Sequence, residues 1–398
     1  MTTGLRMGTQ SRIGLAIALL AALVPGIAHC QTGADPARFW IEQTLARIVK
    51  YQQNPLRAAR SLAAVAVALD EAAAREGSES ELARMSQHAA AGAVLDYLYP
   101  QESPAKHRAI ARFLAAQLAS PEQRTEAMQL AWRAAEDASD RVIARLRDDG
   151  ADRSWNPGLR PAPAPGRWRA TPPLNVYAPS EPLAGTWRTW TIPDVARLTV
   201  PPPPVYDTPE YWREAREVWE VSRQVTPQQR KLADDWHLDK GSVTPAGVWN
   251  HHALGLLRGS SGPAATAEVL AVVNVAMYDA LVAAWHVKYT YWTMRPVTAI
   301  RGKYDAEFLP YLITPPFPSY VSGHASVSGA AAEVLGYYFP ERADQLDAMA
   351  EAAADSRLYG GIHFRSDDEE GLRLGREVGR RVLELLKSKG EAARWTTR

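Results

Sequence analysis

The sequence predicts an all-α protein built from two helical bundles joined by a long extended connector. Apolar residues recur at helical spacing over 37–149 and again over 209–387, with few β-branched runs. Residues 151–208 are instead rich in Pro and Trp, and proline disfavours both helix interiors and sheet ladders. We therefore expect one bundle over 31–150, the connector over 151–208 and a second bundle over 209–398. With 398 residues, of which 46% are apolar, the chain can bury a sizeable core.

Residues 1–30 have the layout of a secretory signal peptide. Arg6 and Arg12 precede the apolar run 13–28, and a region of small residues follows it. This run is short for a membrane span, and an uncleaved anchor is the alternative. Cys30 is the only cysteine; lipid attachment there is a lesser alternative, because a histidine precedes it. We expect an exported protein, periplasmic or secreted, with no disulfide.

The two bundles contain similar stretches. Residues 62–72 (LAAVAVALDEA) are similar to 270–280 (LAVVNVAMYDA), and 54–76 and 122–149 are two of the four or five helices expected in the first bundle. Internal duplication and chance similarity of Ala-rich helices are equal alternatives. Three tryptophans of the connector predict that it packs on the helices, because a free tether gains nothing from them.

Net charge restricts the partners of the protein. The formal net charge is +1, so nothing in the overall electrostatics favours nucleic acid or an anionic membrane surface. We expect no further stretch long and apolar enough to span a membrane after the signal peptide. Any anion site must be local, and nothing in the sequence fixes the oligomeric state.

The stretch 285–296 (WHVKYTYWTMRP) contains two cations among aromatic residues. Lys288 precedes Arg295 by about two helical turns, and Pro296 places Arg295 near the end of that helix. A solvated basic face is the usual role of such cations. The neighbours, including Trp285, are too aromatic for such a face, so we expect an anion to bind here.

The stretch 318–324 (PSYVSGH) leads into a predicted helix. The free N–H groups and the positive end of the dipole at a helix start bind anions, and Gly323 allows close approach to the main chain. The alternative is that Ser322 acts only as an N-cap and that His324 is structural. Read alone, this stretch does not decide between the two.

The stretch 356–370 (SRLYGGIHFRSDDEE) predicts a helix end, a glycine break and a new helix with a capping-box pattern. Arg357 and His363 then lie at the two ends of a tight loop, where both can face one cavity. Asp367, four residues after His363, is a candidate hydrogen-bond partner that fixes the tautomer of the imidazole. Together the three stretches supply cations, a hydroxyl, a glycine N–H and two histidines, which suit a tetrahedral oxyanion.

These three stretches resemble a known signature. Lys288-x6-Arg295-Pro296, Ser322-Gly323-His324 and Arg357-x5-His363-x3-Asp367 are similar, in order and spacing, to the motifs shared by vanadium-dependent haloperoxidases and type 2 phosphatidic acid phosphatases. The longer form PPFPSYVSGH resembles the chloroperoxidase branch, with Val321 in place of a proline.

The resemblance implies a role for each site residue. It implies that the equatorial oxygens of vanadate or phosphate are held by Lys288, Arg295, Ser322, Gly323 and Arg357. His363 would bond the central atom from the apical side, as the vanadium ligand or as a nucleophile, and His324 would be the acid/base on the opposite face. Trp285 and Phe317 resemble the aromatic pair of a halide pocket. Asp239 would match a carboxylate that orients Arg357, with a surface-loop role as the alternative.

Three functions follow in order of preference. The first is a vanadate-dependent haloperoxidase, which oxidises halide with hydrogen peroxide; the aromatic pair and the connector favour it. The second is a soluble exported acid phosphatase, which cleaves a phosphate ester through a phosphohistidine and needs no vanadate. A non-catalytic helical binding protein is the third. Adjacent histidines in 249–252 (WNHH) point in different directions on a helix, so we expect no metal site there.

Overall fold

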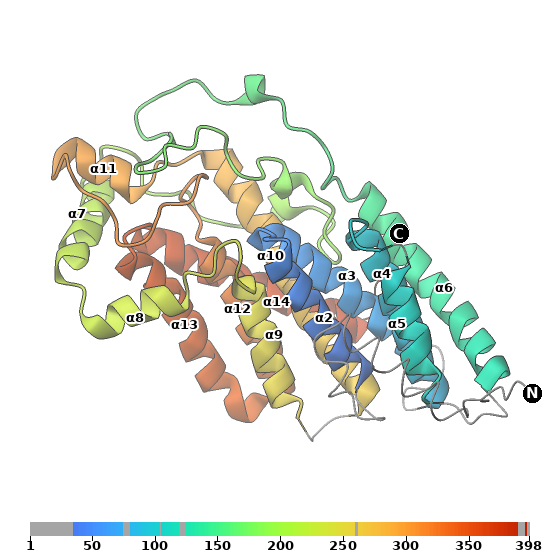
Figure 1. The fold of residues 1–398 in the computed structure, drawn as a ribbon. Coiled ribbons are helices and arrows are strands. Elements are labelled where there is room, and N and C mark those ends of the chain that lie inside the picture. Colours follow the sequence, from blue (N-terminus) through green and yellow to red (C-terminus); the bar gives the residue numbers. More distant parts are fainter. Residues whose placement is uncertain are drawn as a thin grey trace, which may run out of the picture.

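The protein is almost entirely helical. The computed structural model describes residues 35–74, 80–103, 105–118, 124–258, 262–388 and 395. Within these ranges the chain forms 13 α-helices and no β-strand (Figure 1), which confirms the predicted all-α class. The predicted signal peptide, including Cys30, lies outside the described residues.

Five helices form the first bundle: α2 (Pro36–Lys50), α3 (Pro55–Ala74), α4 (Glu81–Leu98), α5 (Lys106–Ala115) and α6 (Arg124–Asp148). Helix α4 packs against α3, α5 and α6. Its start is capped by Ser80, whose hydroxyl accepts a hydrogen bond from the backbone N–H of Ala83 at 3.0 Å. Helix α3 is rich in alanine and buried along most of its length, because small side chains let neighbouring helices approach it closely.

Between α6 and α7 the chain has only short 3₁₀ turns: η2 (Pro157–Leu159), η3 (Ala184–Thr186) and η4 (Val195–Arg197). Trp168, Trp187 and Trp190 are each at most 5% exposed, so this segment lies firmly against the helices. The fully buried Asp279 of α10 holds this segment against the helices. Its carboxylate accepts hydrogen bonds from the backbone N–H groups of Trp190 and Thr191, both at 2.8 Å.

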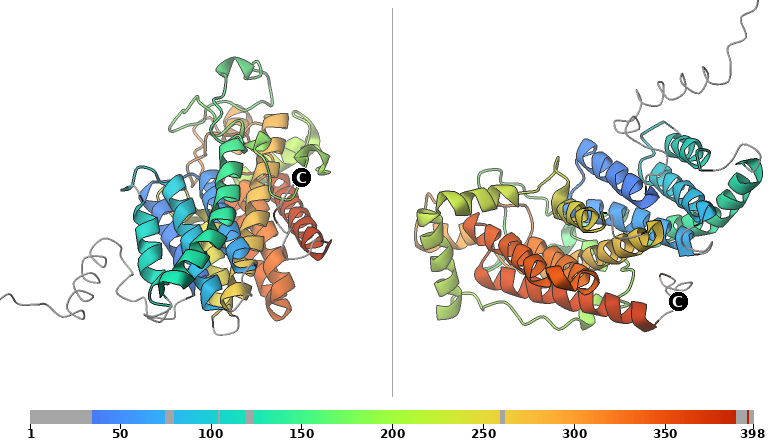
Figure 2. Two further views of the ribbon diagram at one scale, coloured as in Figure 1. Left: turned by 90° about the vertical axis from the view of Figure 1, so that its right-hand side faces the viewer. Right: turned by 90° about the horizontal axis from the view of Figure 1, so that it is seen from below.

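The second bundle follows from residue 209. Its helices are α7 (Pro209–Gln224), α8 (Pro227–Asp235), α9 (Thr244–Leu256), α10 (Pro263–Tyr291), α11 (Pro296–Lys303), α12 (Gly323–Tyr338), α13 (Ala343–Tyr359) and α14 (Arg365–Ser388), with the 3₁₀ turn η5 (Pro340–Arg342) before α13. Helix α12 packs against α10, α13 and α14. The two views of Figure 2 show the blue and teal helices of the first bundle beside the orange and red helices of the second.

Helices α3 and α10 pack against each other where the bundles meet. The similar stretches 62–72 and 270–280 lie on these two helices, and one continuous hydrophobic core extends through both bundles. The expectation that no further stretch has the length and apolarity of a membrane span is wrong for α10. Within Ala265–Tyr291, an 18-residue window has a mean hydropathy of 1.6, but 94% of that window is buried inside the protein. Helix α10 is therefore a buried helix of the core.

Glycines of α14 allow it to lie directly on α12. A Cβ atom at Gly375 would stand 2.1 Å from the carbonyl oxygen of Ser326, and one at Gly371 would stand 2.8 Å from that of Ser322. No side chain fits at either distance. The close contact brings the start of α14 against the start of α12, and these two helix starts carry Asp367 and His324.

Candidate active site

A cavity of about 180 Å³ lies where the starts of α12 and α14 meet the end of α13. Seven of the residues predicted from the sequence line it: Asp239, Trp285, Phe317, Gly323, His324, Arg357 and His363. The first bundle also contributes to the wall through residues 54–56, and the loop between α8 and α9 contributes residues 237–240. The cavity is thus assembled from segments that are distant in the sequence.

Lys288 is fully buried near the end of α10. Its ammonium donates hydrogen bonds to the carbonyl oxygens of Pro318 at 3.0 Å and Ser319 at 2.7 Å, and lies 5.1 Å from the ring centroid of Phe317. Burial lowers the pKa of Lys288 well below its ordinary value, and the charge of Arg295 lowers it further. An anion in the cavity would favour the charged ammonium.

Arg295 follows α10 instead of ending it. The helix stops at Tyr291, Trp292 takes a left-handed conformation, and Arg295 is the extended N-cap of α11, so the prediction that it shares the helix of Lys288 is wrong. The Arg295 guanidinium is fully buried and donates to the carbonyl oxygens of Phe317 at 2.9 Å and Ile362 at 2.8 Å. Its Nη2 has no hydrogen-bond partner among the described residues.

His363 is held from both sides. Its Nδ1 lies 2.9 Å from a carboxylate oxygen of Asp367, and its Nε2 lies 3.0 Å from Nη1 of Arg295. Since a carboxylate accepts and a guanidinium donates, the proton of a neutral ring is on Nδ1 and the lone pair is on Nε2. Burial, followed by the charges of Arg295 and Lys288, lowers the pKa of His363 well below its ordinary value, which favours this neutral form.

Asp367 is fixed by three donors to one carboxylate oxygen. These are Nδ1 of His363, the hydroxyl of Ser319 and the backbone N–H of Phe364 at 3.0 Å. Phe364 immediately precedes α14, so Asp367 makes half of a capping box from the third helical position. The predicted cap from Ser366 is wrong, because the Ser366 hydroxyl donates to Glu214 of α7 instead. Burial raises the pKa of Asp367, whereas Ser319 and Lys288 oppose that rise.

The start of α12 provides the opposite wall. Ser322 is the N-cap of α12, a role that the sequence offered as the alternative to anion binding. Its hydroxyl accepts a hydrogen bond from the backbone N–H of Ala325 at 3.4 Å. Gly323 is the first helical residue, and a Cβ atom there would stand 3.0 Å from the Trp285 ring. His324 follows, and its Nε2 is buried without a hydrogen-bond partner among the described residues. Burial, then the charge of Arg357, lowers the pKa of His324 well below its ordinary value.

Arg357 enters the cavity from the last turn of α13. Its Nε donates to the hydroxyl of Ser356 at 2.9 Å, and its Nη2 donates to the carbonyl oxygen of Ala233 at 3.2 Å. Burial lowers the pKa of Arg357 to about 9, while the charge of Asp368 opposes this. A guanidinium with such a pKa is still protonated at neutral pH.

Asp239 does not orient Arg357. It is exposed in the loop after α8, where its carboxylate accepts from the backbone N–H of Lys240 at 2.7 Å, although it also lines the cavity. The buried carboxylate that acts on Arg357 is Asp368, whose pKa is raised well above its ordinary value by burial and by Asp367. Sequence reasoning missed Asp368, because two consecutive acids at a helix start also fit a simple dipole interaction.

The aromatic pair predicted to line a halide pocket does lie together at the cavity. The ring centroids of Trp285 and Phe317 are 5.0 Å apart, at an interplanar angle of 50°. The indole N–H of Trp285 donates to the carbonyl oxygen of Ser180 at 3.3 Å, and the phenol of Tyr289 donates to the same oxygen at 2.7 Å. The connector therefore fixes this wall, and no sequence signal identified Ser180.

Arg357, His324, His363 and the start of α12 line this cavity, and the buried Lys288 and Arg295 lie behind its wall, against Phe317 and His363. Within the described residues, Nη2 of Arg295 and Nε2 of His324 lack hydrogen-bond partners. Buried polar atoms normally have partners. A tetrahedral or trigonal-bipyramidal oxyanion would supply acceptor oxygens to the cations, so the residues fit such a group chemically. Among the described residues no cluster of His, Cys, Asp and Glu has the arrangement of a cation site, including the histidines of 249–252.

Comparisons with known proteins agree with this arrangement. A family model described as the VCPO second helical-bundle domain matches residues 268–345 and 338–391. No curated sequence relative matches the chain significantly.

Solved structures extend the likeness to the first bundle. A bacterial vanadium-dependent iodoperoxidase has 24% identity and a TM-score of 0.69, over 88% of this chain and 95% of that one. A bacterial vanadium-dependent chloroperoxidase in its holo form has 18% identity and a TM-score of 0.68, over 84% of this chain and 93% of that one. At these identities the likeness concerns the fold. The family model adds a likeness in sequence, which is confined to the second bundle.

Proposed function

We propose that the protein is a vanadate-dependent haloperoxidase, which oxidises a halide with hydrogen peroxide. The observation that carries this proposal is the state of His363. Its Nδ1 faces Asp367 at 2.9 Å, so the lone pair is on Nε2, which lies 3.0 Å from Nη1 of Arg295. A neutral imidazole presented in this way is a good metal ligand.

The remaining residues fit an oxyanion held at that nitrogen. Lys288, Arg295 and Arg357 would bind its oxygens as charged donors, and Ser322 and Gly323 would bind them at the start of α12. Vanadate supplies an electron-poor centre at which peroxide is activated for oxidation of a halide. The protein supplies the charge that keeps the oxyanion bound.

His324 would act as the general acid and base. It lines the cavity and its Nε2 has no partner among the described residues, while its pKa is lowered by burial and by Arg357. A neutral imidazole with a free lone pair can take a proton from incoming hydrogen peroxide and return it to the leaving oxygen. Trp285 and Phe317 would provide a dry wall on which a weakly hydrated halide can rest.

The same geometry supports phosphoryl transfer as the second candidate. Five-coordinate vanadate and the phosphoryl transition state have similar shapes and charges, and Nε2 of His363 is placed to attack phosphorus. His324 would then protonate the leaving oxygen. The aromatic wall at the cavity favours the haloperoxidase, because a weakly hydrated halide can rest against such a surface.

Parallel activity assays separate the two. Purified protein loaded with orthovanadate is given hydrogen peroxide with iodide, bromide or chloride, and halogenation of a phenolic dye is followed. Hydrolysis of an aryl phosphate is measured without vanadate. We expect vanadate-dependent halogenation that the His363→Ala variant loses. Hydrolysis of the phosphate ester without any halogenation would contradict the proposal and support the phosphatase.

We also propose that the protein is exported to the periplasm or beyond. This rests on the basic flank, apolar core and small-residue region of residues 1–30 alone. N-terminal sequencing of the protein recovered from the extracytoplasmic fraction tests it, and a cytoplasmic protein that retains its first residues would contradict it.

A further inference from the structure

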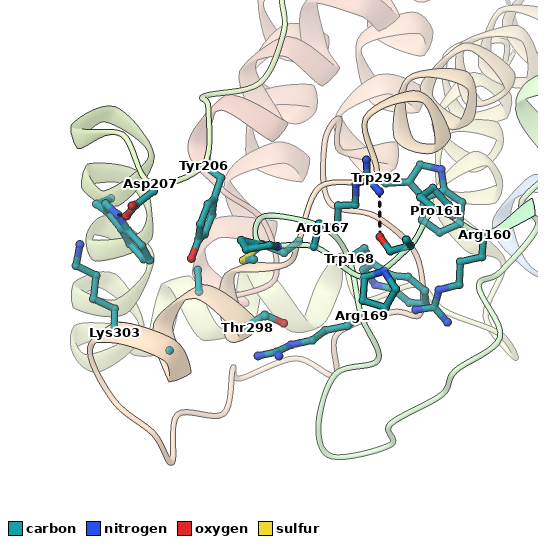
Figure 3. Close-up of a pocket in the computed structure, with 18 residues that line it drawn as sticks. Arg160, Pro161, Arg167, Trp168, Arg169, Tyr206, Asp207, Trp292, Thr298 and Lys303 are labelled. Carbon is teal, nitrogen blue, oxygen red and sulfur yellow. Dashed lines mark hydrogen bonds between the residues drawn. The ribbon is translucent and has the colours of Figure 1, made fainter.

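A second cavity, of about 720 Å³, lies under the connector (Figure 3). Its walls are residues 160–165 and 167–169 of the connector, Tyr206 and Asp207, Trp212 of α7, and Trp292, Met294, Thr298, Ala299, Gly302 and Lys303. It shares no lining residue with the cavity of His324 and His363. The volume falls in the range of sites for small organic ligands, roughly 300–1,000 Å³.

The walls combine cations with aromatic rings. Arg160, Arg167, Arg169 and Lys303 line the cavity, and Asp207 is the only carboxylate among the lining residues. Asp207 is already engaged, because it accepts a hydrogen bond from the indole N–H of Trp212 at 2.7 Å. Within the part of the chain that the structure describes, no ion pair joins a carboxylate to any of the four cations. The lining side chains therefore carry four positive charges and one negative charge, although the chain as a whole is nearly neutral.

Aromatic residues line both ends of the cavity. Trp168 and Trp292 have ring centroids 6.3 Å apart, and the guanidinium of Arg160 lies 5.0 Å from the Trp168 ring. Lys303, at the other end in Figure 3, lies 3.8 Å from the Trp212 ring. Figure 3 also shows Arg169 extending between these ends beside Thr298. Ring faces and charged groups thus alternate along the cavity.

The backbone makes this arrangement rigid. Trp168 donates its N–H to the carbonyl oxygen of Trp292 at 2.7 Å, and Met294 donates to that of Gly166 at 2.9 Å. Gly166 has a φ of +77°, and a Cβ atom there would stand 2.7 Å from Tyr206, so only glycine fits this turn. The indole N–H of Trp168 is buried and has no hydrogen-bond partner among the described residues, so this donor is unsatisfied.

We infer that this cavity binds a small aromatic carboxylate. An inorganic anion would use the cations but leave the aromatic walls in contact with water. A neutral aromatic molecule would stack on the rings but leave the cations unneutralised. An aromatic carboxylate satisfies both sets of groups, through stacking, cation–π contacts and charge-assisted hydrogen bonds. The inference goes beyond the proposed function and does not depend on halide or vanadate chemistry.

Calorimetric titration of the full chain with 2-naphthoate, without any added oxyanion, tests this inference. Three comparison ligands separate the contributions: 2-naphthamide lacks the charge, cyclohexanecarboxylate lacks the aromatic ring, and inorganic phosphate lacks any apolar part. We expect 2-naphthoate to bind at least about tenfold more tightly than each of the three, a difference of about 1.4 kcal/mol.

The Arg169→Gln variant tests whether 2-naphthoate binds in this cavity. Arg169 is exposed and lines it, and Arg153→Gln is the matched control, since Arg153 is an exposed arginine of the same segment outside the cavity. We expect the first change to weaken 2-naphthoate binding by about fivefold or more, and the second to leave it within about twofold. Equal binding of cyclohexanecarboxylate and 2-naphthoate, equal affinities of the two variants, or no binding of 2-naphthoate would each overturn the inference.

Discussion

At the scale of single residues, the site depends on which hydrogen-bond partner each ionisable group finds. His363 is a useful ligand only while Nδ1 is protonated and Nε2 is not, and the carboxylate of Asp367 sets that choice at 2.9 Å. The spacing of four residues predicted this pair. The partners of the cations were not predictable, because Lys288 and Arg295 donate to backbone carbonyls of residues 317–319 and 362, which no side-chain pattern reveals.

Replacing Asp367 tests its control of His363. The Asp367→Asn variant keeps the size of the side chain but removes the charge that accepts from Nδ1, Ser319 and Phe364. We expect vanadate affinity, measured by calorimetry, to fall about 10–100-fold, the usual effect of losing such a partner. Glu369→Gln makes the same chemical change at an exposed position two residues along α14 and is the control. Equal affinity of both variants would show that Asp367 has no such role.

At the scale of helices, the site is placed by close packing of α12 and α14. The sequence predicted both helices and their starts, since the glycine pair and the Ser322-Gly323 step mark the boundaries. It did not predict the end of α10 at Tyr291, because the aromatic run that follows is equally suited to a helix. It also did not reveal which helices touch, since contacts between α3 and α10 join parts of the chain some 200 residues apart.

Two glycine substitutions measure this packing. Gly375→Ala would place a Cβ atom 2.1 Å from the carbonyl oxygen of Ser326 and push α14 away from α12. We expect the free energy of unfolding in urea to fall by about 1–3 kcal/mol. Gly255→Ala, in the exposed part of α9, meets no atom within 4 Å and should gain about 0.5–1 kcal/mol from helix propensity. A Gly375 variant as stable as the Gly255 variant would contradict the close contact.

At the scale of the whole molecule, buried neutral histidines make the fold sensitive to acid. His88 lies in the first bundle, 4% exposed, where its Nδ1 accepts from the indole N–H of Trp40 at 2.9 Å. Burial lowers the pKa of His88 to about 3, with a smaller effect from the charge of Arg84. His324 and His363 are shifted in the same direction. One continuous core joins both bundles, so protonation in either affects the stability of the whole.

The direction of the pH effect follows from that shift. The contribution of neutral His88 to the free energy of unfolding is complete above its unfolded pKa of about 6.5. It is lost as the pH falls toward 3, because the imidazole binds a proton more readily in the unfolded chain than in the folded one. At pH 5 we expect a loss of about 2 kcal/mol from this histidine. In the His88→Gln variant the fall in unfolding free energy between pH 7 and pH 5 should be smaller by that amount. His251→Gln, at an exposed position, should retain the wild-type dependence. Identical pH dependence in both variants would contradict a neutral buried His88.

We propose that His363, beside the buried cations Lys288, Arg295 and Arg357, binds vanadate. Calorimetric titration of the purified protein with orthovanadate tests it without relying on turnover. We predict one binding site per chain, an affinity about 100-fold weaker in His363→Ala, and wild-type affinity in His251→Ala, whose histidine is exposed on α9. Unchanged affinity in His363→Ala, or no vanadate binding by the wild-type protein, would contradict the claim.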